Sequence, residues 1–247
     1  MAHSTEIYPV EIDPFFAEDL RQMERAVNYR RWQFDMVAPF IRGRVLEVGG
    51  GIGNFTPQLA AIAKSIVSIE PNEYCHRQLL EKTGGIPNLA AHRATVESLD
   101  TVIPADDRFD TIILMNVLEH IQDDRAVLAT LQQRLTVDGR LVVLVPAGPW
   151  AFGTTDDRLG HYRRYSKGYA RTLFGGLGLD IEFTRYYNFI GIWAWWWNAK
   201  FHRRANQSDE QIRFFDRLLV PFASQVEKFI HPPVGQSVLI VGRRKKS

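Results

Sequence analysis

Three glycines spaced two residues apart, Gly49, Gly51 and Gly53, form the stretch of the chain best suited to holding a ligand. An apolar run over 45–48 precedes them and a helical apolar pattern follows, which is the layout of a nucleotide-binding βα unit. Glycine permits a positive φ and lets a ligand approach the backbone where a Cβ would hold it away. The sixth position counted from Gly49 is Asn54, and no Gly-Lys-Ser/Thr ending follows. The turn therefore lacks both the dinucleotide fingerprint and the phosphate-binding loop.

Acidic residues lie on both sides of this turn. Glu47 precedes Gly49 by two residues, and Glu70 ends the next apolar run, 17 residues after Gly53. An acid about 20 residues beyond the glycines, at the carboxyl end of a strand, holds a ribose diol, because a carboxylate accepts hydrogen bonds from both hydroxyls. The pattern Glu47-x-Gly49-x-Gly51-x-Gly53 resembles the first motif of class I S-adenosylmethionine (SAM)-dependent methyltransferases. The resemblance implies SAM as the cofactor, bound by these residues and Glu70. A glycine turn of any α/β protein with a solvated acid is the alternative.

Two further stretches carry the same resemblance. The sequence LMNVLEHI at 114–121 looks like the fourth motif of small-molecule methyltransferases, particularly the ubiquinone-pathway O-methyltransferase type. Ligands of open α/β sheets bind at the carboxyl ends of the strands, so residues 116–120 are expected to line the cofactor site, with Asn116 and Val117 as cofactor-binding residues. The segment 94–99 is similar to the adenine-binding segment, although the family often has aspartate where this chain has threonine, a weaker acceptor. The further cofactor residues that the resemblance implies are Pro71, Thr95, Val96 and Glu97.

Two histidines fall where the methyl acceptor is expected. The methyl group of a sulfonium is electrophilic, so the protein needs to align the acceptor with the carbon–sulfur bond. It must also remove a proton when the acceptor is a hydroxyl, and His120 and His161 are the candidates for this base. A carboxylate acceptor would need no base and would be oriented by arginines instead. No spacing of histidine with cysteine or carboxylate indicates a catalytic metal, so none is expected.

The loop after the fifth expected strand is where acceptor-binding residues are predicted. Arg163 and Arg164 precede Ser166, which suits the N-cap of a following helix, and a helix N-terminus favours anions. Because arginine pairs bidentately with carboxylates, an acceptor with an acidic group is expected there. The alternative is that these arginines form salt bridges with Asp156 or Asp157, or face water. The predicted acceptor-binding residues are Trp150, Tyr162, Arg163, Arg164 and Trp193.

Alternating apolar runs and helical patterns over 44–145 predict the parallel sheet that would position these side chains. Strands are expected near 44–48, 65–70, 89–93, 109–115 and 140–145, and helices near 54–63, 72–83 and 123–135. The resemblance implies a Rossmann-like α/β fold: a seven-stranded sheet of order 3-2-1-4-5-7-6 with helices on both faces. Its antiparallel last pair would be 181–187 and 237–242. The predicted core therefore comprises residues 44–187 and 235–247.

The segment before the core is expected to be a helical lid, residues 1–43. Asp13-Pro14 is a helix-start signal, so one helix is predicted over 13–41. Tyr29 and Trp32 lie three residues apart on one face of it. They either shield the methionine part of SAM, as lids do in related methyltransferases, or pack on the next domain.

An insert, residues 188–234, separates the last two expected strands. It begins with an aromatic run that includes Trp193, and a helix is predicted over 208–219. The aromatic run forms the core of a helical cap, lines an apolar acceptor pocket, or lies at a membrane interface. The sequence leaves these three alternatives open.

The composition narrows the functional classes. A formal net charge of +2 is too small to indicate a nucleic-acid-binding protein. Cys75 is the only cysteine, which excludes an internal disulfide and fits a reducing compartment. Neither a signal peptide nor an apolar span of about 20 residues is present, so a cytoplasmic enzyme is expected.

The sequence therefore predicts a SAM-dependent O-methyltransferase of a small molecule, with an acidic group expected on the acceptor. A SAM-binding regulatory module without turnover is one alternative. A methyltransferase of a lipid-linked acceptor at a membrane surface is another. The oligomeric state is left open.

Overall fold

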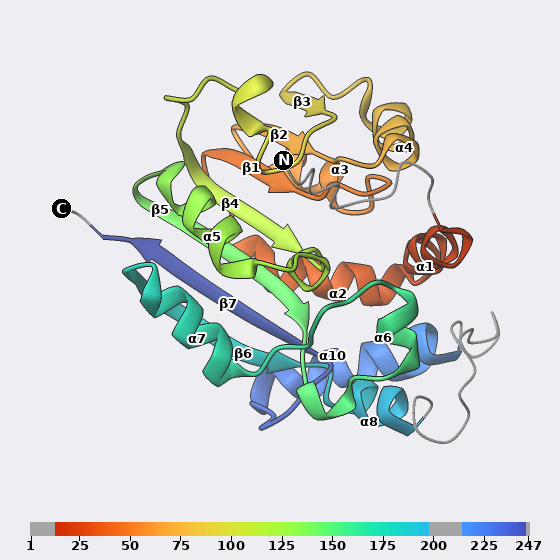
Figure 1. Ribbon diagram of the computed structural model, residues 1–247. Helices are drawn as coiled ribbons and strands as arrows, with labels where there is room; N and C mark the ends of the chain where they lie inside the picture. The colour runs from red at the N-terminus through yellow and green to blue at the C-terminus, as the bar shows by residue number, and fades with distance from the viewer. Residues whose placement is uncertain (1–12, 198–213, 246–247) are drawn as a thin grey trace, which may run out of the picture.

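One mixed sheet forms the centre of the molecule (Figure 1). A computed structural model describes residues 13–197 and 214–245 of the chain. The strands are β1 (Arg44–Val48), β2 (Ser65–Ile69), β3 (Leu89–His92), β4 (Phe109–Met115), β5 (Leu135–Pro146), β6 (Leu179–Tyr187) and β7 (Ser237–Arg244). Their order, β3-β2-β1-β4-β5-β7-β6, confirms the predicted topology. Strands β1 to β5 run parallel, and β7 is antiparallel to both of its neighbours, β5 and β6.

Helices cover both faces of this sheet, as expected. One face packs on α2 (Val27–Val37), α3 (Thr56–Ile62) and α10 (Val220–Phe229), and the other on α5 (Asp124–Gln133) and α7 (Lys167–Gly176). The alternation of side chains along a strand divides its residues between the two apolar layers. In β7, Val238 and Ile240 belong to the layer under α5 and α7, whereas Leu239 and Val241 belong to the layer under α2, α3 and α10. The sheet is therefore buried on both faces, and a ligand is expected at the carboxyl ends of its strands.

Side-chain caps fix where the helices begin. Asn72 accepts a hydrogen bond from the backbone N–H of Cys75 at 3.1 Å and starts α4 (Glu73–Thr83), directly after β2. Ser166 accepts one from the backbone N–H of Tyr169 at 3.1 Å and starts α7, which confirms its predicted N-cap role. Each bond satisfies a donor that the first turn of a helix leaves unpaired.

The prediction of a single helix over 13–41 is wrong. The chain forms α1 (Pro14–Arg25) and α2, separated by Ala26 at φ −81° and ψ 70°, and a 3-10 turn (Ala38–Phe40) follows. The break has a tertiary cause, because the buried carboxylate of Asp216 accepts the backbone N–H groups of Asn28 and Tyr29 at 3.2 and 2.8 Å. A distant residue therefore supplies the N-terminal cap of α2 and frees α1 to turn away across the carboxyl ends of the strands (Figure 1).

The segment between β6 and β7 is helical where the structure describes it. It contains α8 (Phe189–Trp197), a π-helical turn, η6 (Phe215–Leu219), and α10. The predicted helix over 208–219 is helical from 214 onward, and its first six residues lie outside the described part. Because α10 packs on α2 as well as on the sheet, the insert and the N-terminal segment share one apolar layer. Their treatment as separate domains, 1–43 and 188–234, stays a prediction.

Among the described residues, no helix combines the length and the apolar character that crossing a bilayer requires.

Candidate active site

The glycine turn opens onto a pocket at the carboxyl ends of β1, β2 and β4. Gly51 has φ +55°, a conformation that residues with a side chain rarely adopt. A Cβ placed on Gly51 would meet only the Leu20 side chain, at 3.9 Å, so space for a ligand lies beside the backbone. Gly49 differs, because a Cβ there would come within 2.4 Å of Val117. One glycine therefore leaves room for a ligand, and the other lets the turn pack on the end of β4.

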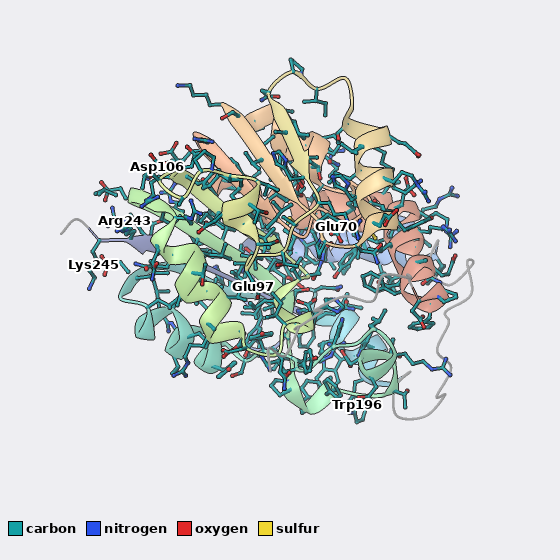
Figure 2. The ribbon with its side chains drawn as sticks, turned by 45° about the horizontal axis from the view of Figure 1, so that its top comes forward. Glu70, Glu97, Asp106, Trp196, Arg243 and Lys245 are labelled. Carbon is teal, nitrogen blue, oxygen red and sulfur yellow. The ribbon has the colours of Figure 1, made fainter. Side chains whose placement is uncertain are left out.

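Glu70 closes the opposite side of the turn. Its two carboxylate oxygens accept the backbone N–H groups of Gly51 and Asn72, each at 2.9 Å. Burial raises the pKa of Glu70 to about 7, although these two hydrogen bonds favour the charged form. Figure 2 shows Glu70 in the middle of the molecule, where β2 ends. The carboxylate retains lone pairs toward the pocket, which fits the ribose diol of SAM.

Glu47 is placed differently from Glu70. It is buried, and its Oε2 accepts the hydroxyls of Thr56 and Ser68 at 2.8 and 2.7 Å. Burial raises its pKa, and the two hydroxyls oppose the shift. These bonds link the end of β1 to α3 and β2, so Glu47 stabilises the position of the glycine turn between them. It is not among the residues that line the pocket.

A second recess adjoins the first and shares Gly49 and Val117 with it. The predicted cofactor residues Pro71, Thr95, Val96 and Glu97 all line this recess. The Thr95 hydroxyl accepts the backbone N–H of Ser98 at 3.2 Å, and the backbone N–H of Thr95 donates to Ser98 Oγ at 2.9 Å. This local turn shapes the segment that the resemblance assigns to the adenine ring.

Three side chains converge at the end of the pocket beyond β4. Glu119 has 0 % exposed surface, and both of its carboxylate oxygens lack a hydrogen-bond partner. Burial raises the pKa of Glu119 to about 7, and the charge of His161 opposes this shift. The ring centres of His120 and His161 lie 4.7 Å apart, with the rings nearly perpendicular. Burial lowers the pKa of His120 to about 3, so this ring is neutral at physiological pH.

One ligand atom from each of Glu119, His120 and His161 lies within 4.8 Å of the others, close enough for a metal ion to contact all three. No spacing in the sequence indicates this cluster, since His161 is far along the chain from the other two. The expectation of no metal therefore rested on spacing in the chain, which does not report proximity in the fold.

A buried carboxylate orients His161. Its Nδ1 lies 2.8 Å from Asp156 Oδ1, and the same oxygen accepts Nε of Arg164 at 2.8 Å. The backbone N–H of Gly153 donates to the other oxygen at 3.0 Å. Burial favours neutral Asp156, but the hydrogen bond from His161 and the charge of Arg164 hold its pKa below the usual value. Because an anionic Asp156 accepts from Nδ1, Nε2 of a neutral His161 carries the lone pair.

The two predicted anion-binding arginines are both engaged within the protein. Arg164 lines the pocket, yet it donates to Asp156 and to the Ala147 carbonyl at 3.1 Å, and it lies 4.5 Å from the Trp195 ring centre. Arg163 forms an ion pair with Asp124 at 2.9 Å and is not among the pocket residues. Arg164 thus follows the salt-bridge alternative that the sequence left open, and Arg163 pairs with an aspartate that the sequence did not suggest.

The predicted aromatic residues divide between pocket, core and surface. Tyr29 lines the pocket, whereas Trp32 is buried in the apolar layer with Tyr29 against its edge. Trp150, Tyr162 and Trp193 are exposed and lie outside the pocket lining. The tryptophan of α8 that faces the pocket is Trp195.

Sequence reasoning missed several residues that line the acceptor end of the pocket. The carboxyl of Asp19 is among them, and burial raises its pKa to about 6 against the charge of His161. Glu119 was expected in the site only as part of 116–120, without a role of its own. The residues missed come from α1, α8 and the start of β7, which only the fold brings together. They are Phe16, Asp19, Trp195 and Ser237.

Comparisons with known proteins agree with this arrangement. A family model described as a methyltransferase domain matches residues 16–208. An uncharacterized methyltransferase of Staphylococcus carnosus is 26% identical over 170 residues, which cover 66% of this chain and 72% of the relative. A ubiquinone biosynthesis O-methyltransferase of Paracidovorax citrulli is 29% identical over 142 residues, which cover 57% of this chain and 55% of that enzyme.

Two solved structures share the fold at low identity. The YcgJ protein of Bacillus subtilis superposes with a TM-score of 0.58 at 18% identity, over 88% of this chain and 99% of its own. The N-methyltransferase NodS of Bradyrhizobium japonicum, solved with S-adenosylhomocysteine, superposes with a TM-score of 0.53 at 16% identity. The superposition covers 99% of this chain and 94% of the NodS chain. With the glycine turn, Glu70 and the sheet order in place, the chain belongs to the class I SAM-dependent methyltransferase family.

Proposed function

We propose that this methyltransferase transfers a methyl group to a hydroxyl of a small molecule, with His161 as the general base. The observation that carries the proposal is the Asp156–His161 pair, 2.8 Å apart, at the acceptor end of the SAM pocket. An imidazole whose Nδ1 is held by a carboxylate keeps its other nitrogen free to accept a proton, which general-base catalysis needs.

Separate groups of residues would bind the cofactor and move the proton. Glu70 and the segment 94–97 would hold the ribose and adenine, and the glycine turn would let the cofactor approach the backbone. When bound, SAM supplies an electrophilic methyl group on a sulfonium. His161 Nε2 would take the hydroxyl proton as the oxygen bonds to that methyl group, while the carbon–sulfur bond breaks and S-adenosylhomocysteine leaves. Asp156 would stabilise the resulting imidazolium, and Arg164 would hold Asp156 in place.

His120 would contribute in another way. Its depressed pKa keeps it neutral, and its ring packs between Phe16, at 5.6 Å, and His161. We infer that it forms the wall against which the acceptor and His161 are aligned. Of the two catalytic candidates, His161 is therefore the proposed base and His120 the proposed positioning residue.

A hydroxyl acceptor fits this pocket better than a carboxylate one. An anion beside His161 would meet the carboxyl groups of Asp19 and Glu119, which repel like charge when ionised. Arg164 and Arg163, which could have offset this repulsion, are paired with Asp156 and Asp124. The acidic group that the sequence suggested on the acceptor thus has little support at this position.

The test is a panel of small alcohols and phenols, amines and carboxylic acids, each incubated with SAM while S-adenosylhomocysteine is measured. We expect turnover with hydroxyl compounds and an O-methyl product. His161→Ala should reduce kcat by roughly 10²–10⁴, the range typical of general-base catalysis. Asp156→Asn should also reduce kcat, and exposed Asp157→Asn is the matched control.

Three outcomes would contradict the proposal. Turnover confined to amines or carboxylates would show that the acceptor class is wrong. Normal rates in His161→Ala would show that this histidine is not the base. SAM binding without turnover on any compound would favour the regulatory alternative.

A further inference from the structure

One helical face of the protein exposes large apolar side chains to solvent. Phe214, Leu218 and Phe222 follow one another at intervals of four residues and are 58%, 59% and 63% exposed. Phe229, at the end of the same segment, is 85% exposed. A surface helix of a globular protein normally turns its polar residues outward. The outer face of residues 214–229, which we call the phenylalanine face, has the opposite polarity.

The acidic residues of this segment point into the protein, and its basic residues face solvent. Asp216 and Glu227 are buried and point inward. Asp216 accepts the backbone N–H groups that start α2, and Glu227 accepts those of Asn188 and Phe189 at the start of α8, at 3.0 and 2.8 Å. Arg217 and Lys228 are exposed. Between 214 and 230 the outer surface therefore carries two cations, one glutamine and apolar residues, and no carboxylate.

A second group of exposed apolar side chains lies on α8. The bond from the Phe189 backbone to Glu227 brings the start of α8 to the end of α10. Phe189 and Trp193 of α8 are 38% and 46% exposed, and their rings lie 6.1 Å apart. Figure 2 shows the neighbouring Trp196 at the lower edge of the molecule, away from Glu70. Exposed apolar side chains that gather on neighbouring helices in this way mark an interaction surface.

We propose that the phenylalanine face docks, parallel to the membrane plane, on an anionic lipid bilayer. An in-plane helix of this type buries its apolar side chains at the headgroup boundary, with cations directed at anionic lipids. The fold supplies both features. Because Asp216 and Glu227 point inward and accept backbone N–H groups, this face carries no carboxylate that anionic lipids would repel. The inference concerns where the protein lies and does not depend on which acceptor it methylates.

A second copy of the chain suits this face less well. In a two-fold symmetric contact the same patch meets itself. Arg217 and Lys228 would then face cations, because the patch offers no carboxylate to pair with them. Charge complementarity thus favours an anionic lipid surface over self-association.

The experiment is co-sedimentation of the full chain with vesicles. One set contains phosphatidylcholine alone, and the other contains phosphatidylcholine with phosphatidylglycerol. We expect binding to the anionic vesicles. Replacing both cations, in Arg217→Gln/Lys228→Gln, should weaken it by about 25-fold, since each cation near an anionic surface contributes about fivefold. Phe222→Ser/Phe229→Ser should weaken it further on both vesicle types.

Matched controls use exposed residues on other helices. Leu80→Ser on α4 removes a side chain that is 44% exposed, and Arg171→Gln on α7 removes an exposed cation. Both should leave sedimentation unchanged, and circular dichroism should show that all variants are folded.

Sedimentation velocity without lipid completes the test. A monomer that binds anionic vesicles, with binding lost in the face variants alone, supports the proposal. A dimer that Phe222→Ser/Phe229→Ser dissociates, with no vesicle binding, would overturn it in favour of self-association. Absence of both binding and dimerisation would also overturn it, as would equal losses in the control variants.

Discussion

The protonation of Glu70 should control cofactor affinity. This carboxylate accepts two backbone N–H groups, is 6% exposed, and has a pKa raised by burial to about 7. Only its charged form keeps a lone pair on each oxygen for a ribose hydroxyl after these two bonds are made. A raised pKa in an acid means that the proton is lost as the pH rises through that value. Affinity should therefore rise as the pH passes through about 7 and level off by about pH 8.

The magnitudes follow from the ionised fraction and from the hydrogen bonds. With a pKa of about 7, roughly one-tenth of Glu70 is ionised at pH 6, so affinity should be about tenfold below its plateau there. Glu70→Gln removes the charge and leaves a single acceptor oxygen, which must also serve the Gly51 and Asn72 N–H groups. A hydrogen bond to a charged group contributes about 1.5–3 kcal/mol, so affinity at pH 8 should fall roughly 10- to 150-fold.

The assay is calorimetric titration with S-adenosylhomocysteine from pH 5.5 to 8. The Glu70→Gln variant should show weak binding without the rise toward pH 7. Glu73→Gln, three residues later and exposed, is the control and should behave as wild type. Unchanged affinity in Glu70→Gln, or a wild-type affinity that is constant over this range, would refute the reasoning.

Three further predictions use other parts of the site and fold. Gly51→Ala should lower S-adenosylhomocysteine affinity at least tenfold in calorimetry. The variant places a methyl group in the ligand space and should also lose about 1–2 kcal/mol of stability because φ is positive; undiminished affinity would contradict the placement of the cofactor. Zn²⁺ should inhibit turnover and a chelator should restore it, because Glu119, His120 and His161 can bind the ion and occupy the lone pair of the base. Activation by divalent cations would instead identify the cluster as a metal centre. Asp216→Ala should reduce the free energy of unfolding by about 1–2 kcal/mol in urea titration, because the α2 cap is lost; unchanged stability would show that the cap is dispensable.

The sequence predicted the parts of the molecule that local patterns determine. The glycine turn and Glu70 are set by a strand, a turn and a second strand close together in the chain, so spacing alone located them. The sheet order came from the family resemblance, and the structure confirms it. The N-cap at Ser166 was likewise readable, because a cap concerns only its own first turn.

Features that depend on distant contacts were beyond the sequence. The helix predicted over 13–41 breaks at Ala26 because Asp216 caps α2 from another part of the chain. The roles of Arg163 and Arg164 depended on their partners, and only the fold shows that Asp124 and Asp156 take them.

The acceptor end of the pocket shows the same limitation. Asp19 reaches it from α1 and Trp195 from α8, and no pattern in the chain connects these residues with His161. The sorting of charge around the phenylalanine face was equally hidden, since it depends on which way Asp216 and Glu227 point.

A crystal structure with S-adenosylhomocysteine would show whether the cofactor lies between Glu70 and His161. We predict ribose hydroxyls on the Glu70 carboxylate, the adenine in the recess lined by 94–97, and the sulfur directed toward His161 Nε2. A ligand bound elsewhere, or one whose sulfur points away from His161 so that no acceptor fits between them, would contradict this account.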